Sequence, residues 1–189
     1  MHRFTEATPV SGPARVVEVS VDDWEIECCA PPPVVGQPTS WTLQFIAATA
    51  STTPELHRDS LWDVVERGSG SVLIDDAVSA FWLPPNGPAP RPGRARLHGF
   101  LAGTVHGGLV PDEVPRITGV VRRIRVIARR FVLSGTGPGR MLEPVPGTLT
   151  LTDVARSPRW FATPAPRTSD HPDNPPFETG VLLDLDVSP

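Results

Sequence analysis

The sequence predicts a mainly β fold: a small antiparallel β-barrel of the OB-like or SH3-like kind, or a sandwich, with one inserted helix and long proline-rich loops. Two observations lead to this prediction. The chain has 24 prolines and 16 glycines among 189 residues, and proline breaks helix interiors and central strands. Several short segments also alternate apolar and polar side chains with a period of two, which indicates half-buried strands.

The first half of the chain supplies two strands, a helix and a loop. A flexible tail over residues 1–15 precedes the first strand, which the alternating valines place at 17–21. Trp41, Leu43 and Phe45 share one face of a second strand over 41–45. The segment 53–67 predicts the inserted helix, because a Thr-Pro start precedes an apolar stripe and a glycine follows it. A proline-rich loop over 84–95 comes next.

The second half supplies the remaining strands. Glycines interrupt an alternating run from Leu97 to Val105, which predicts bends there. Further strands are expected over 120–132, 149–154 and 181–187. The last of these returns to the sheet from a proline-rich excursion over 162–189, so the β-barrel domain itself is placed at 16–161. The predicted core consists of Trp41, Leu43, Phe45, Ile124, Val126, Leu149 and Leu151.

Charge and composition exclude several classes of protein. All 17 basic residues are arginine, the net charge is −4 and the pI is near 5.7, so no global basic field favours nucleic acid. No apolar stretch approaches the roughly 20 residues that span a bilayer, and the first residues lack a secretory signal. Cys28 and Cys29 are adjacent, which is a poor disulfide framework. A cytoplasmic location without membrane contact is therefore expected.

Several stretches resemble a family of small actinobacterial proteins, domain of unknown function 6578. The resemblance lies over residues 16–46 and 98–160. It implies a compact cytoplasmic domain and carries no activity, cofactor or catalytic residue. The stretches that carry it are Val21-Asp22-Asp23-Trp24, Cys28-Cys29, Val35-Gly36, Trp41-Thr42-Leu43, His106-Gly107-Gly108, Thr118 to Ile124, and Arg140 with Pro144 to Gly147.

The strand over 118–133 is rich in arginine. Arg123, Arg125 and Arg129 share one face, and Arg122 lies on the other. Arginine pairs bidentately with phosphate and carboxylate, so an exposed stripe would bind an anionic partner. The alternatives are a solvated strand face or internal pairing with the acidic turn. That turn consists of Asp22, Asp23, Glu25 and Glu27.

The acidic turn has two interpretations of its own. Close carboxylates can bind a hard cation or act as an acid and a base, but the spacing of a calcium loop is absent, so a structural turn is favoured. A zinc site at Cys28, Cys29, His98 and His106 is not expected either. The cysteines are adjacent, and the two histidines would lie about 26 Å apart along a continuous strand. The cysteines are expected to behave as small apolar residues.

A non-catalytic binding module is the function that the sequence favours. The partner is expected to be a protein or a larger assembly, met through the arginine strand and through Trp24 and Trp160 at flanking turns. One alternative is a nucleic-acid-binding barrel. Another is an enzyme that uses the Asp22/Asp23 turn with a histidine. No cofactor and no metal are expected, because no motif for either is present.

Overall fold

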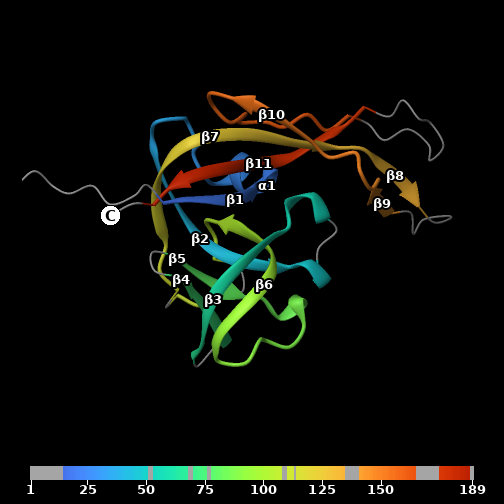
Figure 1. Ribbon diagram of the computed structural model, residues 1–189. Coiled ribbons are helices and arrows are strands. Elements are labelled where there is room, and N and C mark those ends of the chain that lie inside the picture. Colours follow the sequence, from blue (N-terminus) through green and yellow to red (C-terminus); the bar gives the residue numbers. More distant parts are fainter. Residues whose placement is uncertain are drawn as a thin grey trace, which may run out of the picture.

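A computed structural model describes residues 15–50, 53–67, 70–75, 78–107, 110–112, 114–134, 141–164 and 175–187 (Figure 1). These residues form strands, one short α-helix and three single-turn 3-10 helices. The elements are β1 (Val16–Asp22), α1 (Asp23–Cys28), β2 (Pro38–Ala47), η1 (Ala48–Ala50), η2 (Pro54–Leu56), β3 (Arg58–Arg67), β4 (Gly70–Asp75), β5 (Val78–Trp82), η3 (Pro84–Asn86), β6 (Gly93–Thr104), β7 (Ile117–Arg129), β8 (Phe131–Ser134), β9 (Met141–Pro144), β10 (Thr150–Val154) and β11 (Phe177–Asp186).

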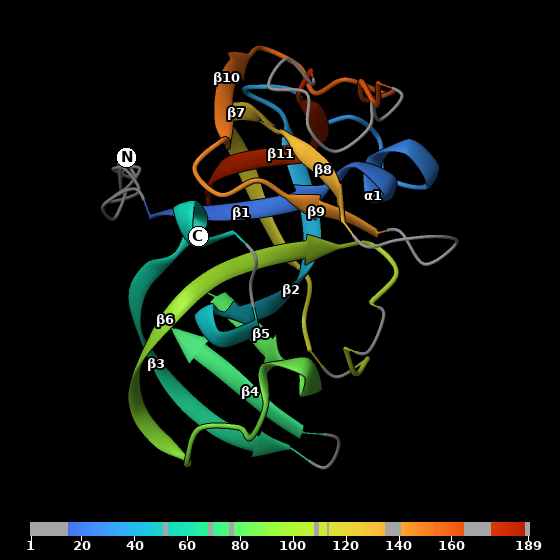
Figure 2. The same cartoon turned by 90° about the vertical axis from the view of Figure 1, so that its right-hand side faces the viewer.

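One large sheet confirms the prediction of a mainly β fold. Its strand order is β10-β7-β11-β1-β6-β2-β5-β4-β3, and β7 also pairs with β2 while β6 also pairs with β3. These two extra pairings close two rings that share the β2–β6 pair. One ring holds β7, β11 and β1, and the other holds β3, β4 and β5 (Figures 1 and 2). The β8–β9 hairpin forms a separate two-stranded sheet.

Two glycines allow β6 to lie against β2 where the rings meet. A Cβ atom at Gly99 would collide with the carbonyl oxygen of Ile46 in β2. A Cβ at Gly103 would lie 3.1 Å from Val19 and 3.3 Å from Trp41. Gly99 thus marks a close approach of the β6 and β2 backbones, which is a recurrent role of glycine within strands, whereas Gly103 fits against side chains of β1 and β2.

The predicted core is largely confirmed. Trp41, Leu43, Phe45 and Ile124 are fully buried, and Val126 is buried with them. Leu149 is only half-buried. The prediction is wrong for Leu151, which is 38% exposed, because it lies on β10 at the edge of the sheet.

The predicted helix over 53–67 is wrong. Only a single 3-10 turn, η2, forms at its start, and residues 58–67 form β3. Within β3 the buried Trp62 and Val64 alternate with the exposed Leu61 and Asp63, which is the period of a strand. The antiparallel pairing of β3 with both β4 and β6 overrides the helical start signal.

The predicted loops and returning strand also have counterparts in the structure. β6 begins at Gly93, inside the loop predicted over 84–95. β11 covers the strand predicted over 181–187 and lies between β1 and β7. Most of the predicted tail, residues 1–14, and residues 165–174 of the excursion lie outside the described residues.

Replacing a fully buried leucine tests this core. We expect Leu43→Ala to lower the free energy of unfolding by about 2–5 kcal/mol, because it removes buried apolar contacts and leaves a cavity. The matched control is Leu61→Ala on β3, where the leucine is 43% exposed and the cost should be within about 0.5 kcal/mol. Urea unfolding of both variants measures the difference, and equal costs would contradict the assignment of Leu43 to the core.

Candidate functional site

Arginines of β7 pair with acids on neighbouring strands. Arg123 binds Asp153 of β10 through two hydrogen bonds of 2.6 and 2.8 Å, from its Nε and one terminal nitrogen. This pairing raises the pKa of Arg123 and lowers that of Asp153. On the opposite face, Arg122 donates from Nε to Asp186 of β11 over 3.0 Å. The two exposed arginines of the strand are therefore compensated by carboxylates.

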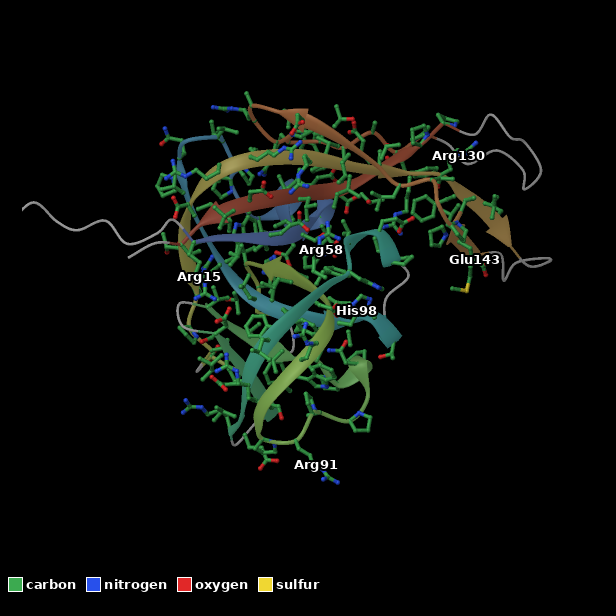
Figure 3. All side chains as sticks on the ribbon, viewed as in Figure 1. Arg15, Arg58, Arg91, His98, Arg130 and Glu143 are labelled. Atoms are coloured by element: carbon green, nitrogen blue, oxygen red, sulfur yellow. A yellow bond between two sulfur atoms is a disulfide. The ribbon has the colours of Figure 1, made fainter. Side chains whose placement is uncertain are left out.

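The buried Arg125 belongs to a larger ion network. It donates to Glu18 of β1 over 2.8 Å and to Asp184 of β11. Glu18 in turn lies 3.1 Å from Arg58 of β3, which is labelled beside His98 in Figure 3. Internal pairing is thus the arrangement that the structure shows for Arg122, Arg123 and Arg125, but their acids are Asp186, Asp153, Glu18 and Asp184 and not those of the acidic turn. Of that turn, Asp22 interacts electrostatically with the fourth arginine of β7, Arg129.

The structure brings two predicted residues, Asp22 and Arg129, to one cleft. The cleft has a volume of about 420 Å³ and lies between the ends of β1 and β7, η2 and the β8–β9 hairpin. Hydroxyl groups, the aromatic side chains of Phe100 and Phe131, and apolar residues complete its walls. Arg129 is buried, and it donates a 2.8 Å hydrogen bond to the hydroxyl of Thr53. A guanidinium and a carboxyl group therefore line the same hollow.

Burial raises the pKa of Asp22 and lowers the pKa of Arg129, so it favours the neutral form of each group. Burial raises the pKa of Asp22, and the nearby charges of Asp23 and Glu25 raise it further, while hydrogen bonding with Trp24 and the charge of Arg129 oppose the shift. Burial likewise lowers the pKa of Arg129, against the opposing effect of Glu55 and Asp22. Asp22 remains accessible to solvent from the cleft although protein surrounds its carboxyl group on other sides.

The predicted acidic turn is a helix start, and its side chains have separate roles. Asp23 accepts a 2.7 Å hydrogen bond from the backbone N–H of Trp24. Glu25 is buried and accepts hydrogen bonds from the hydroxyl of Thr104 and, over 2.9 Å, from the N–H of Val105. Glu27 accepts a hydrogen bond from Phe161 N–H over 2.8 Å. Asp23, Glu25 and Glu27 thus each accept hydrogen bonds from a different part of the chain.

A second site lies at the C-terminal end of α1. Cys28 and Cys29 are joined by a disulfide, and both are exposed. The Nε2 atom of His106 lies 3.3 Å from the Sγ atom of Cys28, and the ring of Trp24 stacks on His106 with centroids 5.5 Å apart. We call Cys28, Cys29 and His106 the α1 cluster. Its ligand atoms all lie within 4.8 Å of one another.

This cluster corrects two expectations. The adjacent cysteines form a disulfide, contrary to the expectation of a poor disulfide framework, and they are exposed instead of behaving as small apolar residues. His106 lies beside Cys28. The anchor of Glu25 to residues 104 and 105 brings the end of β6 to α1, and His106 N–H adds a 3.2 Å hydrogen bond to the hydroxyl of Thr104. His98 has a different environment, because it contacts Asp59 of β3 over 3.1 Å. Sequence spacing alone could not reveal a contact that this buried carboxylate creates.

The two tryptophans predicted for binding are both exposed. Trp24 lies on α1 and is 51% exposed, and Trp160 is 70% exposed. The segment of Trp160 is attached to α1, because the guanidinium of Arg159 donates to the carbonyl oxygens of Ile26 and Ala30 over 2.7 and 2.8 Å. The same guanidinium lies 5.8 Å from the Trp160 ring centre.

A smaller cavity of about 160 Å³ lies between β1, β3, β5 and β6. Its walls are mainly apolar and include Phe45, Trp62 and Leu101. The Arg58–Glu18 ion pair lies at its edge. A volume of this size is below the about 300–1,000 Å³ typical of ligand pockets. The cleft of Asp22 and Arg129 is thus the better candidate for a ligand site.

The raised pKa of Asp22 predicts a change of stability with pH. A carboxyl group whose pKa is higher in the folded state stabilises the fold while it is protonated, and this contribution is lost as the pH rises through the folded pKa. We expect Asp22→Asn to abolish this loss of folding stability at higher pH, because asparagine does not ionise. The stability of the variant relative to the native protein should therefore increase from about pH 4 to about pH 7 in urea unfolding. A difference that stays constant or falls over this range would contradict the raised pKa.

Comparison with known proteins identifies a family whose function is not assigned. Among the described residues, no helix has the length and apolar character needed to cross a membrane. No curated protein and no solved structure matches the chain. One family model matches residues 15–187, which include β3 and β11 as well as the stretches that carry the resemblance. The chain therefore belongs to the family of unknown function DUF6578.

Proposed function

We propose that this chain is a binding module for a small organic anion, and that the ligand lies in the cleft of Asp22 and Arg129. The observation that carries the proposal is the buried guanidinium of Arg129 in the wall of a cleft of about 420 Å³. This volume is within the range typical of small-molecule pockets. A guanidinium presents paired N–H donors that match a carboxylate or a phosphate.

The other walls of the cleft define the rest of the ligand. Phe100 and Phe131 supply aromatic surface, and Leu142 of the β8–β9 hairpin adds apolar surface. A ligand with an aromatic or aliphatic body and one anionic end would match both parts of the cleft. Charge interactions are stronger in a partly desolvated site than in water, so the position of Arg129 favours recognition of the anionic end.

Asp22 gives this proposed site a pH dependence. An ionised carboxylate repels an anionic ligand, whereas a protonated one can donate a hydrogen bond to it. Because burial raises the pKa of Asp22, its neutral form persists to higher pH than that of an ordinary aspartate. Affinity for the anion should therefore be highest at low pH and fall as Asp22 ionises.

Binding is a better proposal than catalysis or nucleic-acid recognition. The described residues that line the cleft include no histidine to act with Asp22. Arg122 and Arg123, the exposed arginines of β7, are paired with Asp186 and Asp153, so they offer little net charge to phosphates. We retain an OB-like or SH3-like barrel and a cytoplasmic location as parts of the proposal, since the ring of strands and the composition favour them.

A protein partner is the second candidate, favoured by the exposure of Trp24 and Trp160. Tryptophan is enriched among the residues that dominate protein interfaces. Trp24 belongs to α1, and Trp160 follows Arg159, which binds the carbonyl oxygens of Ile26 and Ala30. Crosslinking in the organism that encodes the chain would test this candidate. A specific crosslinked partner should be lost with Trp160→Ala and kept with Leu151→Ala, which changes another exposed side chain. Equal recovery with both variants would contradict this surface.

Titration calorimetry with benzoate and phenyl phosphate tests the cleft. We expect binding of benzoate, which is ionised above about pH 5, to weaken as the pH rises from about 5 to about 7. Arg129→Gln should weaken binding of both probes about tenfold or more, which is about 1.4 kcal/mol. Arg123→Gln is the matched control and should leave the affinity unchanged, because Arg123 is exposed and pairs with Asp153. Asp22→Asn should abolish the pH dependence.

A second variant separates loss of the site from loss of the fold. Phe131→Ala shortens a wall of the cleft without changing a buried charge, and it should also weaken binding of benzoate. Thermal melting and near-UV circular dichroism verify that each variant folds. The proposal is wrong if neither probe binds, or if Arg123→Gln weakens binding as much as Arg129→Gln.

A further inference from the structure

The α1 cluster of Cys28, Cys29 and His106 has a composition and geometry that the proposed anion cleft does not use. Two sulfur atoms and one imidazole nitrogen lie within 4.8 Å of one another, and all three residues are exposed. Exposed thiols beside an imidazole are chemically accessible, in contrast to buried structural cysteines. The arrangement brings together the last residue of α1, the residue that caps it, and a residue that follows β6.

We propose that, once the disulfide is reduced, Cys28, Cys29 and His106 bind one soft metal ion, and that monovalent copper is the ion they suit best. Thiolates are soft ligands that select monovalent copper, and imidazole is also a copper ligand. Monovalent copper is satisfied by three ligands. Zinc would need a fourth ligand such as water beside the three residues to complete a tetrahedral site, whereas the three residues alone can complete a site for monovalent copper.

The oxidised and reduced forms differ in their ability to hold an ion. In the disulfide, neither sulfur is a thiolate, so the cluster offers one nitrogen ligand. A dithiol reductant supplies two electrons and two protons, the Cys28–Cys29 bond breaks to give two thiols, and the reductant is left as a disulfide. Metal binding then displaces the thiol protons to the solvent. Reduction therefore creates the site, and the metal stabilises the reduced form.

The surrounding contacts hold the three ligands in position. Glu25 fixes Val105 to α1 with a 2.9 Å hydrogen bond. The indole of Trp24 stacks on His106 with an angle of 4° between the two rings, which restricts the orientation of the imidazole. Groups that orient a ligand in this way are a regular part of metal sites. The Cα atoms of Cys28 and Cys29 are 3.7 Å apart, so both thiolates stay at the end of the helix.

Copper titration of the reduced full-length chain tests the site. The protein is reduced with a phosphine, desalted without oxygen, and titrated with monovalent copper against a chromophoric copper chelator. We expect one copper ion per reduced chain and none bound by the disulfide form. Cys28→Ser and Cys29→Ser should each abolish this binding, and His106→Gln should weaken it at least about tenfold.

His98→Gln is the matched control, because His98 is an exposed histidine that contacts Asp59 instead of the cysteines. It should bind copper as the native chain does. X-ray absorption of the loaded protein should show two sulfur neighbours and one nitrogen neighbour. All substituted side chains are exposed, and the cysteine variants also lack the Cys28–Cys29 disulfide. Each variant should therefore keep the melting temperature of the reduced native chain, which verifies that it folds.

Several results would overturn the inference. These are equal copper binding by the oxidised and reduced forms, binding that survives both cysteine substitutions, or an effect of His106→Gln no larger than that of His98→Gln. Displacement of copper by an equal amount of zinc would overturn the choice of ion. Failure here leaves the anion cleft untouched, because Arg129→Gln should not change copper binding.

Discussion

The close approach of β6 to β2 is the constraint on which the rest of the structure depends. The carbonyl oxygen of Ile46 in β2 leaves no room for a side chain at Gly99, and Val19 and Trp41 crowd the position of Gly103. Because these positions are glycine, β6 can pair with β1, β2 and β3 and so belong to both rings. The same strand ends at Thr104, directly before the residues that Glu25 ties to α1. The packing of two backbones thus determines where His106 lies.

The pairing of charges on β7 is diagonal across the sheet. Asp184 of β11 lies opposite Arg123 but binds Arg125, while Asp153 of β10 lies opposite Arg125 but binds Arg123. Diagonal neighbours are within reach of long side chains in a sheet. Each carboxylate therefore links two strands beyond their backbone hydrogen bonds, and the strand that is richest in arginine becomes nearly neutral. Arg129 lies farther along β7, at the cleft.

Local sequence patterns predicted much of the fold. The candidate sites could not be predicted in this way, because they depend on contacts between residues that are far apart in the sequence. Alternation located β2, β7 and β11 because it reports which face of a strand is buried. The same alternation is present in β3, where Trp62 and Val64 face the core. The capping pattern at Thr53 nevertheless led to the prediction of a helix over 53–67. Nothing local shows that residue 106 reaches residue 28, since that contact requires the ring topology. The pairing of Arg125 with Glu18 requires it too.

The β8–β9 hairpin supplies one wall of the cleft, whereas the large sheet supplies its two ionisable residues. The hairpin follows β7 directly at Arg130 and forms its own sheet, and it projects from the body of the molecule with Glu143 on it (Figure 3). Phe131, Leu142 and Pro144 reach the cleft from this hairpin, whereas Asp22 and Arg129 belong to strands of the large sheet. Phe131 packs on Phe177 of β11, so that part of the wall is coupled to the large sheet. Substitution of Leu142 would instead change the outline of the cleft while Asp22 and Arg129 keep their places on β1 and β7.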